Sequence, residues 1–111
     1  MKRWLTLGFV LLLAVATPLL SAGIGDATAG KEVYTKRCAT CHGPAGEGKE
    51  AIAKMLKVEM RHLGSKEVQA KSDTDLRKII TEGTGKMKPV SGLNGAQIAS
   101  LIVYVRALAK K

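Results

Sequence analysis

The pentapeptide Cys38-Ala39-Thr40-Cys41-His42 constrains this chain more than any other feature. Its C-x-x-C-H spacing indicates covalent attachment of a c-type haem. Two thiols one helical turn apart can form thioether bonds with the two vinyl groups of one porphyrin, and the adjacent imidazole can then bind the iron. We therefore expect Cys38 and Cys41 to attach one haem c, and His42 to be the proximal ligand of its iron.

Other uses of two cysteines fit this motif poorly. A structural disulfide would leave the adjacent histidine unexplained, and a thioredoxin-like site would require a βαβ pattern around it. A structural zinc site commonly takes four cysteine or histidine ligands, often from two separated pairs. This chain offers Cys38, Cys41, His42 and His62, and three of these four lie in one turn. The pattern favours haem over all three alternatives.

The N-terminal residues have the layout of a secretory signal peptide. Lys2 and Arg3 precede an apolar run over residues 4–16, Pro18 interrupts it, and small residues follow up to Gly23. We expect residues 1–23 to be this signal, with cleavage near Gly23. Cleavage at the later A-x-A sequence of residues 27–29 would cut into the first predicted helix. Residues 24–111 then form one domain that carries a single haem.

An uncleaved membrane anchor is the alternative for the same segment. Residues 4–24 contain no charged side chain, and about 20 apolar residues are enough to span a bilayer. Both interpretations place the haem domain outside the cytoplasmic membrane, in the periplasm or an equivalent compartment. This location agrees with the attachment motif, because c-type haem is attached on that side.

The charge of the chain is strongly basic, with 18 Lys and Arg against 9 Asp and Glu. Such a balance favours acidic partners, so we expect redox proteins with acidic docking surfaces as partners. We expect the protein itself to be a monomer. No recognition motif for nucleic acid is present. Five basic residues flank the attachment motif or a later methionine and could steer such partners: Lys36, Arg37, Lys49, Lys86 and Lys88. The alternative is that these side chains only keep a small protein soluble.

Hydrophobic periodicity predicts an all-α fold. The first helix runs from about Asp26 or Thr28 to Cys38, with Asp26 as a plausible N-cap. Val33 and Tyr34 form its buried face. Gly30 lies four residues before Tyr34 on the same face, where a glycine indicates close packing against another backbone.

The remaining elements follow from turn residues and caps. A glycine-rich loop over residues 43–48 is followed by a short helix at 51–56 and by turns over 58–71. A capping box at Ser72–Asp75 opens a helix that ends at Gly83, with Leu76, Ile79 and Ile80 as its apolar face. Asn94, with Gln97 as its box partner, opens the last helix, whose apolar face is Ile98, Leu101, Ile102, Val105 and Leu108.

The second face of the haem iron has several candidate ligands. Met87 lies in a loop with Gly83, Gly85 and Pro89, and such a loop can bring a thioether to the iron. Met55 and Met60 lie in or beside a helical run, where methionine more often fills the core. His62 would give a bis-histidine haem, and it has the alternative role of a solvated or capping histidine. The remaining possibilities are a lysine ligand and no ligand at all.

From Asp26 onward the chain resembles the class I cytochromes c, of the small bacterial kind similar to cytochrome c6 and c5-type carriers. The early C-x-x-C-H motif follows a helix with Gly30 and Tyr34, and the final helix carries Tyr104. The resemblance implies a fold of three to five helices wrapped around one covalently attached haem. It also implies that Met87 is the distal iron ligand, although Lys88 stands between it and Pro89 where the family usually reads Met-Pro. Attachment near the C-terminus, as in cytochromes c′, does not match.

The resemblance implies a one-electron carrier and not an enzyme. A six-coordinate iron held by His42 and Met87 has no vacant position for oxygen or peroxide. If Met87 does not bind, the alternative is an open-site haem protein, such as a gas sensor or a weak peroxidase. A further alternative is a haem subunit of a larger respiratory complex, held in the membrane by an uncleaved N-terminus.

Overall fold

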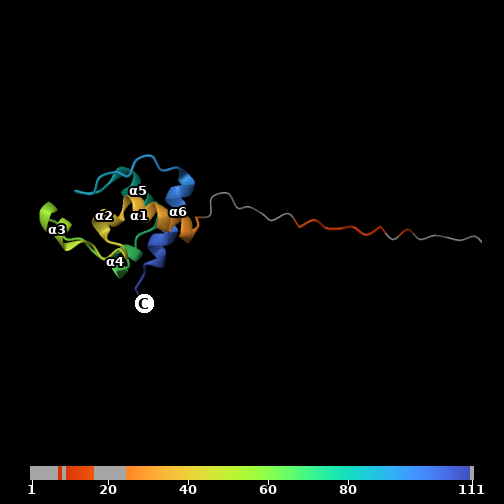
Figure 1. Cartoon of the computed structure of the whole chain (residues 1–111), viewed down its shortest axis with the longest axis horizontal. Helices are drawn as coiled ribbons and strands as arrows, with labels where there is room; N and C mark the ends of the chain where they lie inside the picture. The colour runs from red at the N-terminus through yellow and green to blue at the C-terminus, as the bar shows by residue number, and fades with distance from the viewer. Residues whose placement is uncertain (1–7, 9, 17–24, 111) are drawn as a thin grey trace, which may run out of the picture.

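The computed structural model describes residue 8, residues 10–16 and residues 25–110. These residues form α1 (Ala27–Arg37), α2 (Ala39–His42), α3 (Glu50–Leu56), α4 (Lys66–Gln69), α5 (Asp73–Glu82) and α6 (Gly95–Ala107), as Figure 1 shows. Apart from an isolated β-bridge between Thr84 and Met87, this described part contains no strand, and the predicted all-α class is confirmed. The helices number six rather than three to five because α2 and α4 are single turns of 4 residues each.

The predicted signal peptide, residues 1–23, falls mainly outside the described residues. Within the described part of the chain, every helix is too short or too polar to cross a membrane.

Helices α1 and α6 pack against each other, as Figure 1 shows. Tyr34 of α1 and Leu101 of α6 are each 1% exposed and lie at the centre of the core. Asp26 caps α1 as predicted, because its carboxylate accepts a hydrogen bond from the Thr28 amide at 2.9 Å. The first helix is therefore confirmed, and of its predicted buried face Tyr34 is buried and Val33 is partly buried against the core.

The predicted caps of the two later helices form to different extents. At α6 the box is complete, because the Asn94 side chain accepts from the Gln97 amide and the Gln97 side chain accepts from the Asn94 amide. At α5 the Ser72 hydroxyl accepts from the Asp75 amide at 3.0 Å. Within the described residues the reciprocal bond is found only at α6, so the capping box predicted at Ser72 is half formed.

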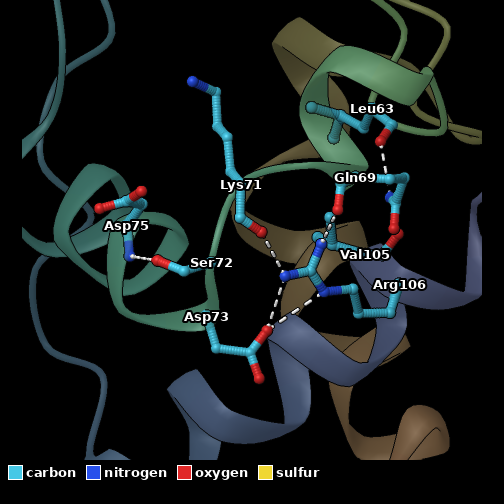
Figure 2. Close-up of polar contacts among 8 residues, drawn as sticks. All are labelled: Leu63, Gln69, Lys71, Ser72, Asp73, Asp75, Val105 and Arg106. Carbon is cyan, nitrogen blue, oxygen red and sulfur yellow. Dashed lines mark hydrogen bonds and ion pairs between the residues drawn. The ribbon is translucent and has the colours of Figure 1, made fainter.

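The segment predicted as turns, residues 58–71, contains α4, and this part of the prediction is corrected. Ser65 caps the helix with its hydroxyl, and Val68 turns into the core. The Arg106 side chain of α6 then holds the end of the segment, as Figure 2 shows: it donates to the carbonyls of Gln69 and Lys71 and to the Asp73 carboxylate. Tertiary contacts with α6 therefore stabilise a helix that is too short to form alone.

Candidate haem site

The C-x-x-C-H motif forms the one-turn helix α2 at the end of α1. The Cys38 carbonyl accepts hydrogen bonds from the amides of Cys41 at 3.2 Å and His42 at 2.9 Å, so the two thiols lie one turn apart as predicted. Two bonds from the following loop close the turn from the other side. The Gly48 amide donates to the His42 carbonyl at 2.6 Å, and the Lys49 amide donates to the Cys41 carbonyl at 3.1 Å.

One apolar cavity brings three of the four predicted site residues together. Cys38, His42 and Met87 line it, although Met87 is 45 residues further along the chain than His42. The space between the side chains is about 500 Å³ and is open in part to solvent. The rest of its lining comes from α1, α5, α6 and the segment before α5: Tyr34, Leu63, Val68, Leu76, Ile79, Ile80, Leu101, Ile102 and Val105. Cys41, the fourth residue, is exposed at the surface of α2.

The His42 imidazole is half-buried in this cavity, and its environment suits a metal ligand. Burial lowers the pKa of His42, so the neutral ring predominates at neutral pH, as iron ligation requires. Its Nδ1 atom is buried and has no hydrogen-bond partner in the described part of the chain. Burial also raises the pKa of the Cys38 thiol to about 11.

Met87 ends a tight turn that begins at Thr84. Its amide donates to the Thr84 carbonyl at 2.9 Å, and its carbonyl accepts from the Thr84 amide at 3.1 Å. The residues between them are Gly85, with a φ of 53°, and Lys86, whose ammonium donates to the Leu56 carbonyl at 2.5 Å. This turn, anchored to the end of α3, fixes the backbone from which the Met87 thioether reaches the cavity.

The other candidate ligands lie away from the cavity lining. Met55 is 69% exposed on α3, and Met60 is half-buried beside the backbone of Gly48. His62 uses its Nδ1 atom to accept a hydrogen bond from the Gly64 amide at 2.9 Å, which is the local capping role. Met87 is therefore the one methionine of the three that the fold brings to His42.

Sequence reasoning missed two groups of functional residues. Leu63 and Val68 line the cavity from the segment that we expected to be turns. Ser65, an N-cap type followed by good helix formers, was the one signal that could have revealed this turn of helix. The Tyr34 hydroxyl was also missed: it donates to the Gly43 carbonyl at 2.6 Å.

The donor set and its surroundings fit a covalently attached haem. A porphyrin needs apolar surroundings, which the lining provides, and it needs thiols at its rim, which Cys41 of α2 and its N-cap Cys38 provide. A half-buried imidazole, whose neutral form is favoured, and a thioether line the same cavity, and they are the ligands found on the iron of many electron-transfer haems.

Comparison with known proteins identifies related cytochromes. The protein family described as "Cytochrome C oxidase, cbb3-type, subunit III" matches residues 25–105. Cytochrome c6 of Rippkaea orientalis is 35% identical over 115 residues, which cover 99% of this chain and 96% of that protein. Cytochrome c-555 of Methylococcus capsulatus is 33% identical over 78% of this chain and 65% of its own length.

A solved structure supports the same conclusion. The KustC0563 c-type cytochrome superposes with a TM-score of 0.63 and 31% sequence identity, covering 73% of this chain and 98% of that one. This chain therefore belongs to the c-type cytochrome family, with the class I fold and a covalently bound haem c with its iron.

Proposed function

We propose that this protein is a one-electron carrier whose haem is attached by Cys38 and Cys41 and whose iron is bound by His42 and Met87. The observation that carries the proposal is the convergence of Cys38, His42 and Met87 on one apolar cavity. The packing of α1 against α6 and the Thr84–Met87 turn support this convergence, because Met87 is far from Cys38 and His42 in the sequence.

The haem supplies a one-electron couple at its iron, and the chain determines how that couple behaves. The Met87 thioether is a soft ligand that favours the ferrous state, and the apolar lining disfavours the additional charge of the ferric state. Both effects raise the reduction potential. The anchored turn around Met87 keeps the sixth position closed, so that electron transfer requires little rearrangement.

The partners in this proposal are redox proteins with acidic docking surfaces, met by a monomer outside the cytoplasmic membrane. The basic residues around the site support this: Lys36, Arg37, Lys49, Lys86 and Lys88 are all exposed. They flank α2, α3 and the Met87 turn, so a partner steered by them would approach close to the haem.

Carbon monoxide binding tests the closed iron site against an open-site sensor or peroxidase. We expect the ferrous holoprotein to bind carbon monoxide poorly at neutral pH, and the Met87→Ala protein to bind it readily. Met55→Ala is the matched control, since it removes an exposed methionine far from the cavity. Rapid binding by the unmutated protein would show an open iron and favour the sensor or peroxidase.

A second candidate is a haem subunit of a larger membrane complex, which the description of the matching family favours. In this case the apolar N-terminal segment would remain attached as an anchor. Mass spectrometry of the mature protein separates the candidates: a chain that begins near Gly23 supports the free carrier, and an intact chain in the membrane fraction supports the subunit.

A further inference from the structure

Tyr34 is buried beside the haem site. Its side chain is 1% exposed, and its ring packs against Tyr104 of α6 with centroids 5.1 Å apart and planes inclined at 52°. It also lines the cavity shared by Cys38 and His42. Because the ring is enclosed where α1 crosses α6, its hydroxyl is a fixed point near α2.

The hydroxyl of Tyr34 uses this position to hold the chain immediately after His42. It donates a buried hydrogen bond of 2.6 Å to the carbonyl of Gly43, whose φ of 82° turns the backbone sharply away from α2. The same carbonyl accepts a longer bond of 3.3 Å from the Gly46 amide. Tyr34 thus links the residue after the attachment motif directly to the core.

Within the described residues, the second ring nitrogen of His42 lacks the hydrogen bond that metal-bound histidines usually make. In most metal-bound histidines the second ring nitrogen donates to a carbonyl or carboxylate, which fixes the orientation of the ring. Here Nδ1 is buried without a partner in the described part of the chain. The bonds at the His42 and Gly43 carbonyls hold the backbone on either side of the ring, and this backbone bears on the orientation of the imidazole.

We infer that Tyr34 is a positioning residue for the haem: its hydroxyl, bonded to the Gly43 carbonyl, sets the orientation of the His42 ring at the iron. This inference rests on the proposed ligation of iron by His42. Without the hydroxyl, the Gly43 carbonyl keeps only its longer bond from the Gly46 amide, so the turn after His42 relaxes and the ring rotates. The electronic structure of the iron then changes even though no ligand is lost.

The test compares two single-atom changes in the ferric holoprotein. Tyr34→Phe removes the bonded hydroxyl and keeps the ring, and Tyr104→Phe removes the hydroxyl from the other ring of the same pair. Proton NMR of the haem methyl groups reports the orientation of the axial imidazole. We expect a redistributed methyl pattern and a shifted midpoint potential for Tyr34→Phe, and a wild-type pattern for Tyr104→Phe. A wild-type pattern and potential in both would overturn the inference, even if Tyr34→Phe lowered the melting temperature.

Fluorotyrosine labelling keeps the test decisive if Tyr34→Phe does not fold with haem. The chain has 2 tyrosines, so the Tyr104→Phe protein labelled with 3-fluorotyrosine carries the label at Tyr34 alone. The label keeps the hydroxyl and makes it a stronger donor, so we expect the methyl pattern to move; an unchanged pattern would overturn the inference. Failure of the proposed function would instead appear in the unmutated protein, as a high-spin ferric spectrum.

Discussion

Gly30 of α1 lies directly against the backbone carbonyl of Ser100 in α6. A Cβ atom placed on Gly30 would overlap this carbonyl and would lie 2.9 Å from the Cβ of Tyr104. The two helices approach so closely only because residue 30 has no side chain. Since Tyr34 lies one turn further along α1, this contact also positions the wall of the haem cavity.

Gly30→Ala should therefore destabilise the protein by about 1–3 kcal/mol or more, because the overlap is with backbone and cannot be relieved by a side-chain rotation. Gly95→Ala is the matched control, since nothing lies within 4 Å of a Cβ at that helical position. The control should change stability by less than about 1 kcal/mol. Urea unfolding measures both, and equal stability of the two variants would contradict the close α1–α6 contact.

Arg106→Ala should lower the free energy of unfolding by about 1–3 kcal/mol, because two backbone carbonyls of the segment before α5 lose a charged donor. Arg106→Lys should not restore it, since an ammonium cannot reproduce the planar fork shown in Figure 2.

The matched control for Arg106 is Asp73→Asn, which removes only the ion pair with an exposed carboxylate. This variant should lose about 1 kcal/mol or less, and salt should remove the difference. If Asp73→Asn costs as much as Arg106→Ala, the ion pair and not the carbonyl contacts holds the segment.

Tyr34 should make stability depend on pH at the alkaline end. Burial raises the pKa of Tyr34 to about 12, whereas a tyrosine in the unfolded chain titrates near 10. Between these values the folded state keeps a proton that the unfolded state has released, so stability falls as pH rises.

Tyr34→Phe lacks this titration, so its stability deficit relative to the wild type should shrink by up to about 2 kcal/mol between pH 10 and pH 12. Thermal or urea unfolding over this pH range measures the difference. A deficit that stays constant from pH 7 to pH 12 would show that the phenol is not buried in the folded protein.

Lys88→Glu should slow the oxidation of the ferrous protein by the anionic complex ferricyanide, by about two- to fivefold at low salt. The exposed ammonium of Lys88 lies beside Met87, so its reversal weakens the positive field at the site. A cationic oxidant should show the opposite change, and both effects should fade as salt screens the charges.

Lys31→Glu, which makes the same change in net charge on the outer face of α1, is the control. Stopped-flow rates for the two variants separate a local field from the overall charge. Identical rates would mean that the basic side chains act only through net charge.

Much of this fold could be predicted because the decisive signals are local. The Asp26 and Asn94 caps depend on residues within three positions, and the attachment motif lies within five. The helix α4 could not be predicted, since its 4 residues are stabilised by contacts with Val105 and Arg106 of α6. The length of such a helix gives no periodicity to detect.

For the candidate site, too, the local part could be predicted and the part that depends on tertiary contacts could not. The spacing of Cys38, Cys41 and His42 indicates haem attachment without any knowledge of the fold. The glycines and the proline around Met87 indicate a loop. From the residues alone, however, any of three methionines could be the distal ligand, and only Met87 among them lines the cavity. The bond from Tyr34 to Gly43 spans only nine residues, yet it depends on the course of the chain after α2, which no propensity encodes.

The most direct test of the central claim is the visible to near-infrared spectrum of the oxidised holoprotein. Ligation by His42 and Met87 predicts a low-spin spectrum with the weak methionine-to-ferric-iron charge-transfer band. The band should disappear in Met87→Ala and persist in Met55→Ala and Met60→Ala. A high-spin spectrum without the band in the unmutated protein, or a band that survives Met87→Ala, would contradict the account.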